Sequence, residues 1–205
     1  MRRLWLAVLW VMAGGLRAAE PPHWQPLGEP GSGGWMTSIT VNPHNSRQVL
    51  LGGDMLGIGR SEDRGNRWQP TFGLRSYEIG DCTWHPTDAN VVWAGTVSGP
   101  YLSTDGGRTW SERRVGMPAV SDGRYTCAIE KVLFDPSDAR RLLAFGGSSR
   151  GWDAPQAWWG TVWESRDGGA NWAAVATLPA ADKPGNIVGA AFAAGGRRVY
   201  AAVRG

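Results

Sequence analysis

Three copies of one eight-residue pattern divide this chain of 205 residues: SEDRGNRW at 61–68, STDGGRTW at 103–110 and SRDGGANW at 165–172. Each copy has serine first, aspartate third, glycine fifth and tryptophan last. A motif that recurs at long and similar intervals indicates a repeat architecture, in which every copy belongs to one structural unit. The pattern therefore predicts the organisation of the fold before any single strand is assigned.

The repeating unit is larger than the eight-residue motif. Each copy follows two apolar stretches, and the first of these stretches ends in a proline turn at Pro43, Pro86 or Pro136. Units of roughly 40 to 50 residues, with short apolar runs separated by Gly, Pro, Asn and Asp, are typical of four-stranded propeller blades. A fourth unit begins with the apolar runs 190–192 and 199–203.

We therefore predict an all-β protein, a β-propeller segment of four-stranded antiparallel blades with about three and a half blades present and the ring incomplete. A signal peptide is expected at 1–18 and the N-terminal part of the propeller at 19–205. The ring would be completed by blades beyond Gly205 or by blades from a partner. The expected blade units are 35–72, 78–114, 125–176 and, incomplete, 187–205.

The three motifs are expected to form structural corners. Aspartate at a tight turn accepts hydrogen bonds from backbone N–H groups, glycine adopts positive φ, and serine bonds locally. The tryptophan would bury its ring between neighbouring blades. Equivalent carboxylates in successive blades are spread around a ring, which argues against one shared catalytic site. The predicted corner residues are Ser61, Asp63, Gly65, Trp68, Ser103, Asp105, Gly107, Trp110, Ser165, Asp167, Gly169 and Trp172.

The motifs resemble Asp-box (BNR-type) repeats. The stretch GGDMLG at 52–57 with the motif after it, and WAGT at 93–96 with YLSTDGGRTW at 101–110, look like the propellers of sortilin-type receptors. They look equally like xyloglucanase-type propeller glycoside hydrolases. The resemblance covers nearly everything from Trp24 onward and implies a propeller fold. Asp-box sialidases usually carry an Arg-Ile-Pro segment, which is absent ahead of the first motif here.

The first 18 residues have the features of a secretory signal. Arg2 and Arg3 precede an apolar run over 4–16, and small residues follow at Ala18 and Ala19. The run is too short for a good membrane span, so a secreted or periplasmic location without a span is expected. The chain has 21 Lys plus Arg against 18 Asp plus Glu, and the three arginines of the leader account for the excess. Nucleic-acid binding therefore has no support from composition.

The two cysteines and three histidines of the sequence do not form a metal-binding pattern. Cys82 and Cys127 could form a disulfide in an exported chain or remain two buried thiols. None of the histidines has a partner at metal-ligand spacing. No metal and no cofactor is expected.

Strand alternation separates the loops into two rims. The proline turns and the eight-residue motifs share one rim, because both connect strands in the same direction. The opposite rim receives the loops 52–57, 96–100 and 146–160 and the links 71–80 and 113–125. Binding residues are often found on loops over a rigid scaffold, so the working surface is expected there.

Asp54 is the first candidate on that rim. Its segment resembles the Asp-x-Gly-Gly segment in which xyloglucanase-type enzymes hold one of two catalytic carboxylates, although Leu56 replaces the first glycine. A glycosidase needs two such groups, and the resemblance implies that the other comes from a distant second propeller. Asp81, Asp122 and Asp153 are further acidic options. Alternatively, Asp54 caps a glycine turn.

The insertion 146–160 is the second candidate, with the ligand-binding residues Arg150, Trp152, Trp158 and Trp159. Indole rings can lie flat against sugar C–H groups, or they can fold back over the neighbouring blade. Two functions remain open: an exported propeller that binds and perhaps cleaves polysaccharide as a glycoside hydrolase, and a sortilin-like propeller that binds a peptide or protein without chemistry.

Overall fold

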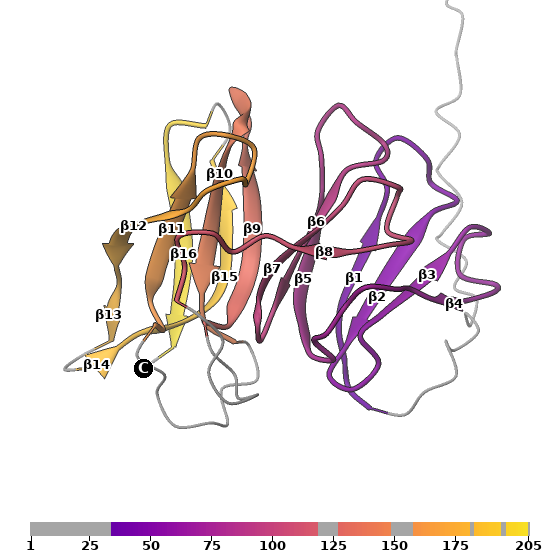
Figure 1. Ribbon diagram of the computed structural model, residues 1–205, viewed down its shortest axis with the longest axis horizontal. Helices are drawn as coiled ribbons and strands as arrows, with labels where there is room; N and C mark the ends of the chain where they lie inside the picture. The colour runs from indigo at the N-terminus through magenta and orange to yellow at the C-terminus, as the bar shows by residue number, and fades with distance from the viewer. Residues whose placement is uncertain (1–33, 119–126, 149–157, 181–182, 194–195, 205) are drawn as a thin grey trace, which may run out of the picture.

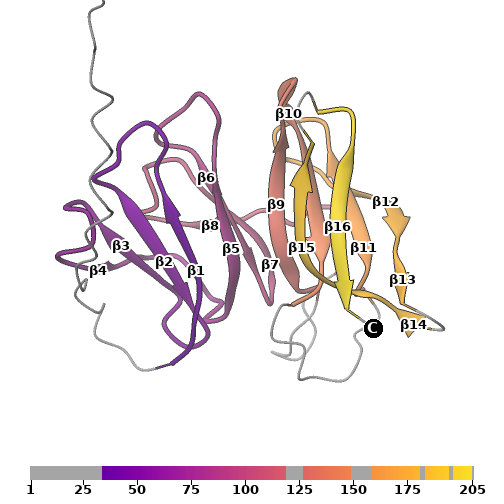
Figure 2. The ribbon, with the colours of Figure 1, turned by 180° about the vertical axis from the view of Figure 1, so that it is seen from behind.

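The computed structural model is all-β over the residues that it describes, which are 34–118, 127–148, 158–180, 183–193 and 196–204. Three four-stranded antiparallel sheets follow one another along the chain, and Figures 1 and 2 show them standing side by side. In each sheet the spatial order of the strands is their chain order or its reverse. Each sheet is therefore an up-and-down propeller blade, and the predicted fold class is confirmed.

Each blade contains one copy of the eight-residue motif, which begins at the end of the third strand and ends before the fourth. Blade 1 consists of β1 (Met36–Val41), β2 (Val49–Gly53), β3 (Ile58–Ser61) and β4 (Gln69–Pro70). Blade 2 consists of β5 (Ile79–Trp84), β6 (Val92–Thr96), β7 (Gly99–Ser103) and β8 (Ser111–Glu112). Blade 3 consists of β9 (Ile129–Asp135), β10 (Asp138–Gly146), β11 (Thr161–Ser165) and β12 (Ala173–Thr177).

A fourth unit has two strands among the described residues. The short hairpin of β13 (Pro179–Ala180) and β14 (Lys183–Pro184) leads into β15 (Asn186–Phe192), which pairs with β16 (Val199–Arg204). The first strand of each unit packs beside the first strand of the next, so that β1, β5, β9 and β15 are neighbours in that order. This arrangement gives three complete blades and half of a fourth.

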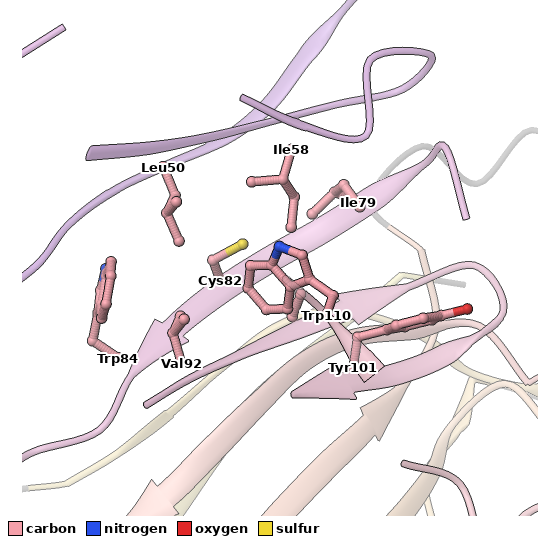
Figure 3. Packing of buried hydrophobic residues seen from close by; sticks show 9 residues of the cluster. Leu50, Ile58, Ile79, Cys82, Trp84, Val92, Tyr101 and Trp110 are labelled. Carbon is pink, nitrogen blue, oxygen red and sulfur yellow. The ribbon is translucent and has the colours of Figure 1, made fainter. Parts of the chain in front are cut away.

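The hydrophobic core lies between the blades. Figure 3 shows Leu50 and Ile58 of blade 1 packed against Ile79, Cys82 and Trp110 of blade 2. The next interface repeats the arrangement around Trp93 and Trp172, and the third around Leu143 and Ile187. Burying one such aliphatic side chain contributes about 1.5–3 kcal/mol, so these interfaces are a main source of stability for the blades.

The segments after β4 and β8 add backbone hydrogen bonds between blades. Trp110 N donates to Phe72 O at 2.9 Å, and Trp172 N donates to Val115 O at 2.9 Å. In both cases the residue that follows the acceptor is a glycine with positive φ, Gly73 or Gly116. The link out of one blade therefore pairs with the motif tryptophan of the next blade.

The two cysteines are free and buried, in different interfaces. Burial raises the pKa of the Cys127 thiol to about 11. Burial, together with the adjacent Asp81 carboxylate, also raises the pKa of Cys82. Of the two alternatives, the structure shows two buried thiols and no bridge between them.

Candidate functional site

The three eight-residue motifs, called here the boxes, make the same short-range hydrogen bonds in all three blades. The serine hydroxyl donates to the aspartate and accepts the N–H of the motif glycine, and the aspartate also accepts the N–H of the residue four positions later. The serine-to-aspartate distances are 2.9, 2.8 and 2.8 Å, in Ser61–Asp63, Ser103–Asp105 and Ser165–Asp167. The glycine-to-serine distances are 2.8 Å each, at Gly65, Gly107 and Gly169. Each of these carboxylates therefore accepts hydrogen bonds that close its own turn.

Each box lies against the turn between the first two strands of its own blade. One backbone hydrogen bond recurs there, from Arg64 N to Arg47 O, Gly106 N to Asn90 O and Gly168 N to Arg140 O, at 3.0, 2.8 and 2.9 Å. The boxes and these turns therefore form one rim of the blades, called here the box rim. The other connections lie on the opposite rim, called the loop rim.

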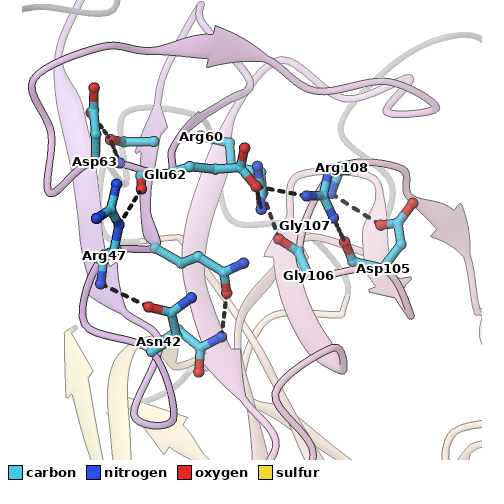
Figure 4. Close-up of polar contacts among 12 residues, drawn as sticks. Asn42, Arg47, Arg60, Glu62, Asp63, Asp105, Gly106, Gly107 and Arg108 are labelled. Carbon is cyan, nitrogen blue, oxygen red and sulfur yellow. Dashed lines mark hydrogen bonds and ion pairs between the residues drawn. The ribbon is translucent and has the colours of Figure 1, made fainter.

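A polar contact joins neighbouring blades on the box rim (Figure 4). The buried Arg60 donates to Gly106 O of the next box at 2.7 Å and pairs with Glu62 at 2.8 Å. Arg108 of blade 2 pairs with the same Glu62 at 2.6 Å. Hydrogen bonding from Arg60 lowers the pKa of Glu62. The contact fixes one box against the next, which is a structural role.

Hydrogen bonds also lower the pKa of the box aspartates. Burial acts to raise the pKa of Asp105, but hydrogen bonds from Thr109, Ser103 and Arg108 outweigh it and lower the pKa to about 2. Hydrogen bonds from Asn171 and Ser165 lower the pKa of Asp167 to about 2. The ordinary value is 3.8, so the folded state releases these protons at lower pH than the unfolded chain does.

We expect the free energy of unfolding to fall as the pH is lowered from about 4 to about 2. Above pH 4 the stabilisation is complete, and it is lost as the pH falls through the folded-state pKa. Near pH 3 one such aspartate contributes a slope of about 0.8 proton. Asp105→Asn, which keeps an oxygen acceptor for Thr109, should remove that share of the slope in chemical unfolding at several pH values. An unchanged slope would contradict this assignment.

Asp54 lies on the loop rim, immediately after β2. It is buried, and its Oδ1 accepts the backbone N–H of Trp35 at 2.7 Å, while its own N–H donates to Trp35 O at 3.0 Å. Gly34 has a φ of 127°, and a side chain there would collide with Asp54 Oδ1. The chain before β1 is thus shaped around this carboxylate. Asp54 does cap backbone here, and this contact also fixes one carboxylate oxygen in place.

Large apolar side chains are exposed beside Asp54. Trp35 bonds to it through the backbone, Met55 follows it in the chain, and both are exposed. Tyr77, on the link into blade 2, is also exposed, and its carbonyl accepts the N–H of Gly57 at 3.0 Å. Neither Trp35 nor Tyr77 was predicted from the sequence to belong to the site. The sequence feature that could have identified them is an aromatic residue shortly before the first strand of a blade.

Asp81 occupies a different position from Asp54. It lies within β5, its Oδ2 pairs with Lys131 Nζ of blade 3 at 2.5 Å, and its Oδ1 accepts the N–H of Cys82 at 2.7 Å. The ion pair crosses an interface between two blades. Asp122 and Asp153 lie outside the described residues.

The insertion between β10 and β11 is described only at its end. Arg150 and Trp152 lie outside the described residues. Trp158 is exposed, with its ring centroid 6.1 Å from that of the buried Trp163. Trp159 is buried, so its ring offers little surface to a ligand. Of the predicted stacking pair, the geometry makes Trp158 the residue that can contact a ligand.

Two buried glutamates on the loop rim were not singled out by sequence reasoning. Glu78 precedes β5 and Glu130 lies in β9, and both line a small pocket between blades 2 and 3 with Thr96 and Ser148. The Ser148 hydroxyl donates to Glu78 Oε1 at 3.4 Å. They were missed because they belong to different blades and share no motif. The lining of the pocket is mainly polar and includes residues of both blades.

Within the described ranges, no three His, Cys, Asp or Glu side chains gather in a way that could hold a metal ion. Nor does that part of the chain include a helix that is long and apolar enough to cross a membrane.

The repeated sheets and their strand order define a segment of a β-propeller. No protein-family model matches the chain, and no curated protein matches it. Among solved structures, an ancestral GH74 enzyme is similar over 88% of this chain and 23% of its own, with 25% identity and a TM-score of 0.67. The GH74 enzyme of Niastella koreensis is similar over 82% of this chain and 26% of its own, with 20% identity and a TM-score of 0.58.

A third similar structure is YCF48 bound to the D1 peptide, with 16% identity, a TM-score of 0.50, and coverage of 80% of this chain and 46% of that one. The Niastella and YCF48 likenesses show the fold alone. This chain spans about a quarter of the length of the two GH74 enzymes. Structures built on this fold thus include enzymes and a peptide complex.

Proposed function

We propose that this chain is part of an exported Asp-box propeller that binds a polysaccharide on its loop rim, with Asp54 as one of two carboxylates of a glycoside hydrolase. The observation that carries the proposal is the fixed position of Asp54, a buried carboxylate held by the backbone N–H of the exposed Trp35. A buried, oriented carboxylate beside flat apolar surfaces suits a sugar-binding site. The likeness to an ancestral GH74 enzyme supports the same class.

Asp54 can serve as a general acid, base or nucleophile only with a second carboxylate across the scissile bond. No described residue is assigned to that role, and further blades are expected to supply it. The geometry gives the first carboxylate its orientation, because Trp35 N–H holds Oδ1. The sortilin-like alternative would use the same rim to bind a peptide without chemistry.

Asp54→Asn is expected to reduce hydrolysis of xyloglucan or β-glucan at least about a hundredfold in the protein that carries both carboxylates. The asparagine oxygen can still accept the Trp35 N–H, so the fold and glycan affinity should change little. Release of reducing sugar and glycan binding are measured side by side. Asp81→Asn is the matched control and should retain activity. Retained activity in Asp54→Asn would exclude the catalytic role.

Trp158→Ala is expected to weaken binding of a xyloglucan oligosaccharide by about 1 kcal/mol or more, roughly fivefold in Kd, because an exposed ring loses its stacking surface. Isothermal titration calorimetry on the full chain measures this change. Tyr200→Ala removes another exposed aromatic ring, within β16 and not on a loop, and should leave the affinity unchanged. No glycan binding by the unaltered chain, or binding of peptides instead, would favour the receptor alternative.

A further inference from the structure

One backbone hydrogen bond recurs on the loop rim of the three complete blades. The residue just after the second strand donates its N–H to the carbonyl of the residue just before the first strand. The three bonds run from Asp54 to Trp35, from Val97 to Glu78 and from Gly147 to Ala128, at 3.0, 3.2 and 3.0 Å. Asp54, Val97 and Gly147 therefore occupy equivalent positions. This corner forms with an aspartate, a valine or a glycine, so its backbone bond does not require a carboxylate.

Blade 1 makes a second bond at the same corner. Asp54 is 7% exposed, and its Oδ1 accepts the N–H of Trp35 at 2.7 Å. The side chains of Val97 and Gly147 contain no oxygen, so they cannot make the equivalent bond. Taking a carboxylate out of water costs free energy, and the other two blades form this corner without one. The Asp54 carboxylate is therefore an addition to the corner that the blade fold does not require.

The preceding position on the first-strand side also differs between the blades. It is Gly34 in blade 1, with a φ of 127°, but Tyr77 in blade 2 and Cys127 in blade 3. Cys127 keeps a side chain there even at a φ of 59°. A Cβ on Gly34 would lie 2.4 Å from Asp54 Oδ1, and every other atom near it would be at 3.5 Å or more. In blade 1 the carboxylate oxygen thus takes the place that a side chain would need.

We propose that Gly34 is a positioning residue for Asp54, because its bare backbone lets Oδ1 reach the Trp35 N–H and so sets the direction of the carboxylate. The inference rests on the proposed function, in which Asp54 is one of two catalytic carboxylates. Catalysis depends on reacting groups that are held in one geometry. A side chain at position 34 would displace Oδ1 and break its bond to Trp35. Gly34 brings no chemical group of its own, so it acts only through Asp54.

A double-mutant cycle tests the contact without any measurement of activity. In the full chain, Gly34→Ala should raise the equilibrium constant for unfolding at least about tenfold more when Asp54 is present than in an Asp54→Ala background. This factor is that expected for the loss of one hydrogen bond to a charged group. The strain of positive φ is common to both backgrounds and cancels in the comparison. Urea unfolding of the four forms gives the factor, and equal effects in the two backgrounds overturn the proposal.

The reaction gives a second readout in the protein that carries both carboxylates. Gly34→Ala should lower kcat for xyloglucan hydrolysis at least about tenfold and leave KM within about twofold, because the ligand surface stays and the carboxylate turns. Gly168→Ala is the matched control, since Gly168 has a φ of 75° but lies in a box on the opposite rim, and it should keep both constants. An unchanged kcat in Gly34→Ala overturns the proposal. If the unaltered protein hydrolyses no glycan, the proposed function fails, and the cycle alone decides whether Gly34 positions the carboxylate.

Discussion

Trp172→Ala is expected to lower the free energy of unfolding by about 3–5 kcal/mol, the cost typical of removing a fully buried tryptophan. The indole of Trp172 is buried between blades 2 and 3, where it meets Trp93 edge to face with ring centroids 5.7 Å apart. Its Nε1 also donates to Arg113 O at 2.9 Å. The substitution therefore leaves a cavity and a carbonyl without its donor.

Trp68 provides the matched comparison, because it occupies the same motif position in blade 1. It is only half-buried, since none of the described residues forms a blade before it. Trp68→Ala should cost about 1–2 kcal/mol, according to the smaller apolar area that it buries. Equilibrium urea unfolding measures both values, with unchanged m-values as the sign that the unfolding reaction is the same. Equal losses would contradict the assignment of the cost to burial between blades.

Gly116→Ala is expected to cost about 3 kcal/mol, from unfavourable positive φ and from the loss of a hydrogen bond. Gly116 has a φ of 92°, and a Cβ there would collide with the carbonyl oxygen of Trp172. Because this neighbour is backbone, it cannot rotate away. The link would have to move, and the bond from Trp172 N to Val115 O would weaken.

Two other glycines separate these contributions. Gly168 has a φ of 75°, and a Cβ added there would meet no atom within 4 Å, so Gly168→Ala should cost about 1 kcal/mol from φ alone. Gly189 has open space and no positive φ, so Gly189→Ala should change stability by a few tenths of a kcal/mol. Thermal and chemical unfolding of the three variants gives the order. If Gly116→Ala lowers the free energy of unfolding no more than Gly168→Ala does, the close approach of the Gly116 and Trp172 backbones does not add to the cost.

The sequence was sufficient to predict features that depend on neighbours along the chain. The box hydrogen bonds join residues two to four positions apart, so the motif contains every group that they need. The strands around each box follow from apolar runs bounded by turn residues. Their recurrence gave the blade count, and the alternation of strands gave the two rims.

The candidate site could be predicted only in part. Asp54 was found because its glycine-rich segment resembles a known one, but its hydrogen bond to Trp35 joins two separate segments. Trp158 and Trp159 are adjacent, yet one is exposed and the other buried. Glu78 and Glu130 line one pocket from two different blades, and their spacing in the sequence does not predict that they lie together.

The short motifs thus determine the local turns, because a turn that is closed by hydrogen bonds within four residues forms in the same way wherever the motif occurs. Burial is not local: Trp68, Trp110 and Trp172 have the same motif position, but within the described residues a preceding blade covers only the last two. Ile39 and Tyr200 are apolar or aromatic and are exposed, because no described sheet covers their faces. Whether an apolar residue becomes core depends on the sheet beside it, and that neighbour is fixed by packing in three dimensions.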